Sequence, residues 1–227
     1  ALKKNAQAFV GNIILPALRV DVENLLGKSD SWKIILDKED PDQQTILFNY
    51  PKVFNYGEGE VGYIKPQIKL EFGARGEINP SERRSIIPYA AETFPEQFKN
   101  SSQEVTVLAA ERTFWEKATI LHALYHGSNL RDRMSRHYYD TFMLFQRGVS
   151  EKAMQTPELL GNVVRNKSLM FRDSKASYDT AVIGSLKLVP SAGQQSILKK
   201  DYEKMEEMFR ENTLILMLSW RDLLTLK

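Results

Sequence analysis

The stretch FWEKATILHALYH, residues 114–126, has the spacing of an amphipathic helix with one residue in an unexpected place. At about 100° per residue, Phe114, Leu121 and Tyr125 fall within one narrow apolar sector. Lys117 falls inside the same arc, between Leu121 and Leu124. Lysine stems often lie along apolar surface while the ammonium group reaches water. The pattern therefore predicts either a solvated lysine or a cation that is held in place to meet a phosphate.

The composition is that of a folded intracellular protein. A chain of 227 residues with 42% hydrophobic content can bury a sizeable core, as one domain or two. The sequence has neither an apolar run of about 18 residues nor the apolar core of a signal peptide, so we expect a cytoplasmic protein without a membrane partner. The absence of cysteine excludes disulfides and thiolate metal sites. A net charge of +2 neither supports nor excludes a nucleic-acid partner.

The first part of the chain predicts one helix followed by strands. Residues 1–27 have helical apolar spacing, with a kink or break at Pro16 and an end near Gly27. From Ser31 the apolar period changes towards two, which indicates three antiparallel strands. These segments are SWKIILD (31–37), QTILFNYPKVF (44–54) and VGYIKPQIKLEFGAR (61–75).

The second part predicts helices. After a polar, proline-containing segment (76–102) and a short apolar run, VTVLA (105–109), the period becomes helical. The expected helices are 110–127, 132–147, 150–171 with a break near Pro157, and 197–226 with a break near Asn212. The sequence thus predicts an α+β fold, with a β-rich first half (domain 1–105) and a helical second half (domain 106–227).

The strand QIKLEFGAR (67–75) carries a candidate metal ligand. Alternation places Ile68, Leu70 and Phe72 on one face and Lys69 and Glu71 on the other. Two interpretations remain open for the polar face. It is either a solvated surface with cross-strand ion pairs or a site where Glu71 binds Mg²⁺ together with other hard oxygen ligands.

The helix RDRMSRHYYDTFMLFQRG (131–148) separates apolar and charged residues. Its charged side carries Arg133, Arg136, Asp140 and Arg147. An exposed Arg136–Asp140 pair at i,i+4 would contribute only a few tenths of a kcal/mol. Alternatively, Asp140 orients a phosphate-binding arginine or a substrate hydroxyl. His122 and His126 have the i,i+4 spacing of a metal pair, but the HExxH glutamate is absent, so we expect no zinc site.

Four blocks of this sequence together resemble the AbiEii-like toxin family of nucleotidyltransferases. They are IKLEFGAR (68–75), PYAAETFP (88–95), VTVLAAERTFWEKATILHALYH (105–126) and SRHYYDTFML (135–144). The resemblance implies a DNA polymerase β-like nucleotidyltransferase core with an added helical domain. It further implies a toxin paired with an antitoxin protein, a nucleoside triphosphate bound with Mg²⁺, and, as in some relatives, tRNA or another RNA as acceptor.

The resemblance also implies roles for individual residues. Glu71 matches a metal-binding carboxylate, and Lys117 and Asp140 match catalytic positions, with Lys117 facing a nucleotide cleft. The residues implied to contact the nucleotide are Lys69, Lys117, Arg136 and Lys167, with Tyr178 in the same cleft.

One family motif is missing from these 227 residues. Family members begin with a Gly-Gly or Gly-Ser turn followed by a D-x-D strand, whereas the DPD of residues 40–42 stands in a turn after a strand. We therefore expect a truncated protein with little or no transfer activity, because one carboxylate cannot hold two metal ions. Two alternatives remain: an inactive module that binds an antitoxin or RNA through Arg133, Arg136 and Arg147, and a structural domain without a ligand.

Overall fold

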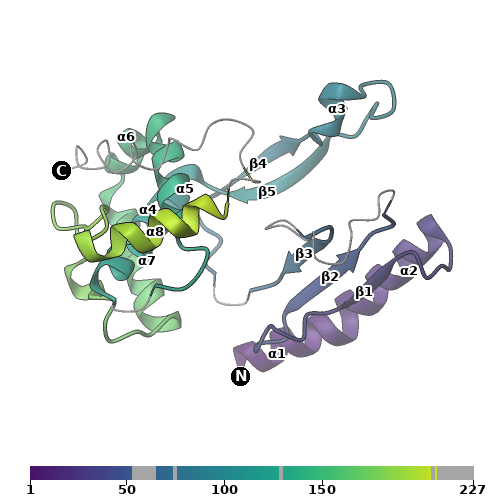
Figure 1. Ribbon diagram of the computed structural model, residues 1–227, viewed down its shortest axis with the longest axis horizontal. Coiled ribbons are helices and arrows are strands. Elements are labelled where there is room, and N and C mark those ends of the chain that lie inside the picture. The colour runs from purple at the N-terminus through teal and green to yellow at the C-terminus, as the bar shows by residue number, and fades with distance from the viewer. Residues whose placement is uncertain (53–64, 74–75, 128–129, 206–207, 209–227) are drawn as a thin grey trace. The chain divides into compact units, whose positions relative to one another are not determined.

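The computed structural model describes residues 1–52, 65–73, 76–127, 130–205 and 208. Two small antiparallel sheets precede a helical second half, which confirms the predicted α+β class (Figure 1). The contacts divide the chain into two compact units, Ala1–Gly76 and Glu77–Lys227. The domain division after residue 105 stays a prediction. None of the described helices is long and apolar enough to cross a membrane.

The first unit begins with the helical segment predicted for residues 1–27. It consists of α1 (Leu2–Phe9), the π-helical turn η1 (Val10–Ile14) and α2 (Leu15–Leu26). In η1 the Leu15 N–H donates to the Val10 carbonyl, so the turn widens just before Pro16, which cannot donate. The helix ends at Gly27, whose φ of 73° lies in the region that favours glycine.

The first sheet has the strand order β1 (Lys33–Leu36), β2 (Thr45–Asn49), β3 (Ile68–Glu71), all antiparallel. Its register places Leu36 beside Ile46 and Ile46 beside Leu70, so these side chains share the face that packs against the helix. Phe72 joins this cluster, whereas Ile68 is half exposed. The predicted alternation of β3 is therefore confirmed. The ends of the predicted second and third segments that fall within 53–64 and 74–75 lie outside the described residues.

The second unit starts with a β-hairpin that the sequence did not predict, although the apolar run 105–109 overlaps its second strand. β4 (Ser81–Ile86) pairs with β5 (Gln103–Leu108), and the short helix α3 (Ala90–Thr93) lies in the connection. Most side chains of both strands are exposed.

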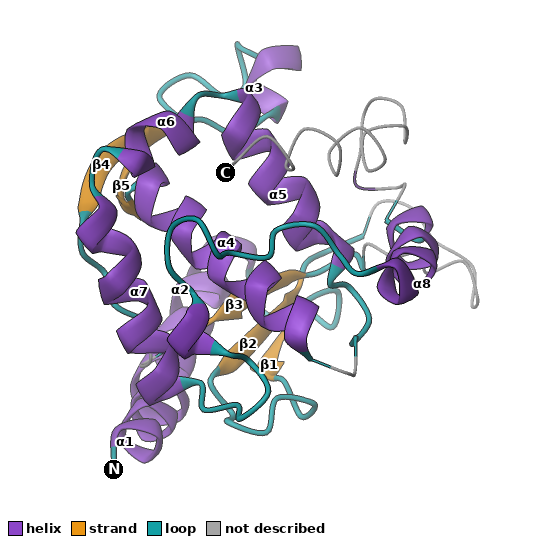
Figure 2. Cartoon of the chain, turned by 90° about the vertical axis from the view of Figure 1, so that its left-hand side faces the viewer, coloured by secondary structure: helices purple, strands orange, loops and turns teal. Residues whose placement is uncertain are grey.

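The remaining helices pack around α4, which spans Ala110–His126, except α8, which packs against α5 (Figure 2). They are α5 (Ser135–Gln146), α6 (Val149–Met154), α7 (Pro157–Met170), the 3₁₀ turn η2 (Tyr178–Thr180) and α8 (Ala192–Glu203). The bounds of α4 to α7 confirm the first three predicted helices, including the break at Pro157. The last predicted helix differs, because α8 begins at Ala192, before the predicted start at residue 197, and ends at Glu203. The part of the last predicted helix that includes Asn212 lies outside the described residues.

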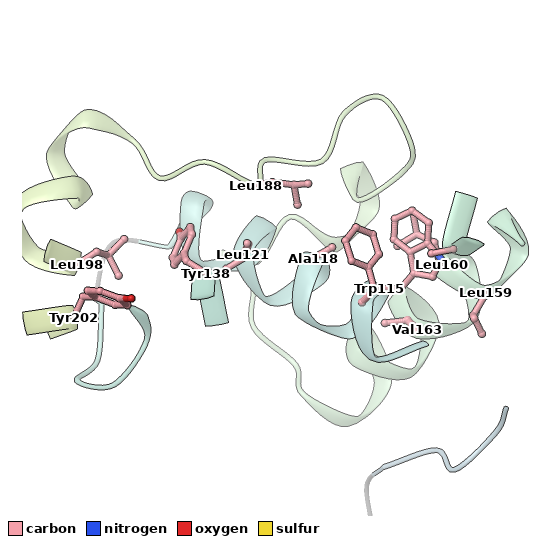
Figure 3. Packing of buried hydrophobic residues seen from close by; sticks show 12 residues of the cluster. Trp115, Ala118, Leu121, Tyr138, Leu159, Leu160, Val163, Leu188, Leu198 and Tyr202 are labelled. Carbon is pink, nitrogen blue, oxygen red and sulfur yellow. The ribbon is translucent and has the colours of Figure 1, made fainter. Parts of the chain in front are cut away.

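The core of the second unit is built on the apolar side of α4. Trp115, Ala118 and Leu121 are buried together with Tyr138 of α5 and Val163 of α7 (Figure 3). Lys117 is not part of this cluster, although the helical wheel places it among these residues. Its surroundings are therefore the starting point for the site.

Candidate functional site

Lys117 bridges the two central helices of the second unit. Its Nζ lies 2.6 Å from Oδ2 of Asp140 and 3.3 Å from Nδ1 of His137. Both acceptors belong to α5, three residues apart, and so project from adjacent positions on one side of that helix. Two consecutive helices thus meet at one ammonium group.

The burial of Lys117 explains its place on the helical wheel. Its side chain is 23% exposed, so most of it is covered while part of it still reaches the surface. Lys117 thus stands in the apolar arc of α4 at the point where His137 and Asp140 of α5 contact it. Neither a sealed core position nor a freely solvated lysine describes this geometry.

His137 is neutral in this arrangement. Burial, followed by the charges of Lys117 and Arg136, lowers the pKa of its imidazole to about 4. An ammonium group only donates hydrogen bonds, so Nδ1 of His137 accepts and the ring proton lies on Nε2. A neutral histidine can act as an acceptor beside a cation without adding charge.

A second group of charges adjoins Lys117 on α4. Glu116 accepts a hydrogen bond from Nε of Arg112 at 3.3 Å, and its other oxygen lies 3.6 Å from Nζ of Lys167 on α7. The Lys167 side chain is only 12% exposed, and its burial lowers the pKa of the ammonium group. The Lys117 and Arg112 charges lower that pKa further, which indicates that these cations lie within electrostatic range of one another.

Arg112 connects this cluster to the start of the hairpin. Its side chain is 1% exposed and donates from Nη1 to the Asn79 carbonyl at 2.6 Å. Its Nη2 lies 3.1 Å from a Glu77 carboxylate oxygen. A buried guanidinium that touches three separate chain positions holds Glu116 in a fixed direction.

Two predicted site residues have other surroundings. Arg136 is exposed, and in the described part of the chain Asp140 pairs with Lys117 instead of with Arg136. Tyr178 opens the turn η2, whose Thr180 hydroxyl lies 3.2 Å from Nε2 of His122. The i,i+4 Arg136–Asp140 ion pair of the surface interpretation is thus not formed.

His122 is used structurally. Its Nδ1 accepts the Lys187 N–H at 3.2 Å, and its Nε2 lies 3.0 Å from the Ser177 carbonyl. Both ring nitrogens are therefore engaged, and burial lowers the pKa of the ring. The absence of a zinc site at His122 and His126 stays a prediction.

Glu71 and Lys69 belong to the first unit, on the sheet face away from the helix. Lys69 Nζ lies 2.9 Å from Glu71 and 3.7 Å from Asp37, so this face carries ion pairs. The hydrogen bond with Glu71 raises the pKa of the Lys69 ammonium group, and the charges of Asp37 and Asp40 raise it further. Among the described residues, no group of three or more histidine or carboxylate side chains could hold a metal ion.

Comparison with protein families decides the relationship that the four sequence blocks suggested. A family model described as the nucleotidyl transferase AbiEii toxin of type IV toxin–antitoxin systems matches residues 3–225. The chain belongs to the AbiEii family. Searches of curated proteins and of solved structures returned no match. The family is one of toxin nucleotidyltransferases, so membership implies an antitoxin as partner and a nucleotide as substrate.

Sequence reasoning missed three residues of the cluster in this AbiEii chain. His137 stands three residues before Asp140, so the spacing within SRHYYD could have indicated a shared acceptor pair. Glu116 and Arg112 share the i,i+4 spacing on α4. No sequence signal connected either of them with Lys167 of α7.

Proposed function

We propose that this chain belongs to a toxin that transfers a nucleotide from a nucleoside triphosphate to an acceptor, and that its Lys117 binds the phosphates. The observation that carries the proposal is the contact of Lys117 with Asp140 and His137. In the described part of the chain these two acceptors engage two of its three N–H groups, which leaves one for a phosphate oxygen. A lysine that is held but accessible can neutralise the charge that develops on a transferred phosphoryl group.

Nearby cations support this assignment. Lys167 of α7 lies 3.6 Å from Glu116. The charges of Lys117, Arg136 and Lys167 each lower the pKa of the His137 ring. Three cations from three helices thus surround one neutral ring. A polyphosphate would gain attraction from all three, and the carboxylates of Asp140 and Glu116 hold the lysines in place while no phosphate is bound.

Nucleotidyltransferases generally use a divalent ion, and we expect Mg²⁺ with Glu71 as one ligand. The described residues do not fit a complete site, because Glu71 is paired with Lys69 and none of them form a group of three or more histidine or carboxylate side chains that could hold a metal ion. We expect residues 1–227 to bind nucleotide but to transfer it slowly or not at all.

The acceptor that we propose is an RNA such as tRNA. Arg136 lies in the first turn of α5 and Arg147 directly follows its last residue, and both are exposed. Retention of tRNA should fall with rising salt and on replacing both arginines by alanine. If neither salt nor the two substitutions change the retention of tRNA, RNA is not the acceptor. The same result would contradict the alternative that the chain is an inactive module that binds RNA. An antitoxin that binds this chain remains the expected protein partner.

Binding of ATP, GTP, CTP and UTP to Lys117→Ala tests the phosphate site. Loss of a charge-assisted contact should weaken the binding of the preferred nucleotide by about tenfold or more. Lys28→Ala is a matched control, because Lys28 is 86% exposed and pairs with Glu23 in the first unit. Equal affinities of Lys117→Ala and wild type would contradict the proposal. Rapid transfer of labelled nucleotide by residues 1–227 would contradict the expected inactivity.

A further inference from the structure

His137 has a place in the cluster that the family motifs do not assign. Its Nδ1 and the Asp140 carboxylate both accept from the Lys117 ammonium, at 3.3 Å and 2.6 Å. We propose that His137 is a positioning residue, which together with Asp140 fixes the direction of the remaining Lys117 N–H group. This inference rests on the proposed function, because that direction matters only if a phosphate lies there.

The surroundings of His137 require the imidazole to be neutral. The charged groups that act on it are Lys117 of α4, Arg136 and Asp140 of α5, and Lys167 of α7. Three of these four groups are cations, and the ring is also partly removed from water. A protonated ring would repel the Lys117 ammonium, and its Nδ1 could no longer accept.

A neutral acceptor has an advantage over a second carboxylate at this position. Asp140 already compensates the positive charge of Lys117. Another carboxylate would orient the lysine equally well, but its negative charge would repel a phosphate. An imidazole nitrogen supplies direction without that repulsion. The positioning role thus predicts which substitutions preserve binding and which do not.

The first test is ¹⁵N spectroscopy of the three histidine rings in the full chain, assigned with His137→Asn and His122→Asn. At pH 7 we expect His137 as the Nε2–H tautomer with an accepting Nδ1. Lys117→Met should raise the His137 pKa, because the ammonium charge that opposes protonation is gone. His122 is the internal control and should not change in Lys117→Met, since its partners are Lys187 and Ser177. An Nδ1–H tautomer, or an unchanged His137 pKa, would overturn the inference.

The second test compares the affinity of His137→Asn, His137→Asp and His137→Leu for the four nucleoside triphosphates. Asparagine offers a neutral acceptor and should bind nearly as well as wild type. Leucine removes the acceptor and aspartate adds a negative charge, so each should bind about tenfold more weakly, about 1.4 kcal/mol. Binding of His137→Leu at the wild-type level would overturn the positioning role. If wild type binds none of the nucleotides, the proposed function fails, and the ring spectra alone decide whether His137 positions Lys117.

Discussion

At the scale of single residues, the helical wheel identified Lys117 as unusual but could not explain it. The wheel records only the angle of a side chain on its own helix, whereas the contacts of Lys117 come from Asp140 and His137 on α5. The sequence therefore predicted the cation and the carboxylate as separate features. Their meeting at 2.6 Å depends on how α4 and α5 pack, which local periodicity does not encode.

The neutral His137 makes the stability of the protein depend on pH. Its pKa of about 4 in the folded chain lies below the ordinary value of 6.5, so between these values the unfolded chain binds more protons. The contribution of His137 to the free energy of unfolding should therefore be complete above pH 6.5 and should decrease as the pH falls towards 4. At 1.36 kcal/mol per pH unit, and with partial exposure, the His137 contribution amounts to about 2 kcal/mol.

Urea unfolding of wild type and His137→Asn between pH 4 and pH 8 measures this contribution. The variant should lose less stability on acidification, because it has no ring to protonate. His122 also has a lowered pKa, but it contributes to both proteins and cancels in the comparison. Parallel pH dependences of the two proteins would show that His137 titrates normally.

At the scale of elements, the sequence predicted those helices and strands that have a regular apolar face. The three strands of the first sheet and the helices α4 to α7 all bury such a face, which explains why their periodicity was readable. β4 was missed because SERRSI is mostly polar and exposed. Its strand conformation comes from backbone pairing with β5, which side-chain patterns do not report.

The start of α5 depends on a contact that no local pattern shows. Asp201 of α8 accepts the Arg133 N–H at 2.6 Å, the Ser135 N–H at 2.9 Å and the Ser135 hydroxyl at 2.6 Å. Burial alone would raise the pKa of the Asp201 carboxyl, but these hydrogen bonds outweigh it and lower the pKa. A carboxylate from another helix thus satisfies N–H groups that the helix itself leaves open.

Asp201→Ala should therefore lower the free energy of unfolding by about 2–4 kcal/mol, because buried donors lose a charged acceptor. The contribution of Asp201 is present above the ordinary pKa of 3.8 and should be lost as the pH falls through the lower folded value. Asp132→Ala is the matched control, since Asp132 is largely exposed and lies 3.7 Å from Lys204. Urea unfolding should show a change within about 0.5 kcal/mol for this control. Equal effects of both substitutions would contradict the capping role of Asp201.

At the scale of the whole molecule, the chain contains two hydrophobic clusters built from separate parts of the sequence. One draws its buried members from Val10 to Ile46 and the other from Phe114 to Tyr202. Within the described residues, the two clusters share no member. Because burial of apolar surface is the main source of stability, each unit should have its own unfolding transition.

Tryptophan fluorescence can follow the two units separately. Trp32 lies in the first unit and donates to the Gly27 carbonyl, whereas Trp115 is buried in the second. In a Trp220→Phe background, single-tryptophan variants then report one unit each. Ile46 is completely buried in the first unit, so Ile46→Ala should destabilise that unit by about 2–5 kcal/mol.

We expect Ile46→Ala to lower the urea midpoint reported by Trp32 and to leave the midpoint reported by Trp115 unchanged. Leu121→Ala, at an equally buried position of the second unit, should produce the opposite result. If either substitution moves both midpoints by the same amount, the two clusters unfold as one cooperative system. In that case Glu71 of the first unit and Lys117 of the second would share one folding equilibrium. If the midpoints separate, a substitution at Lys117 can weaken nucleotide binding while the sheet that carries Glu71 keeps its stability.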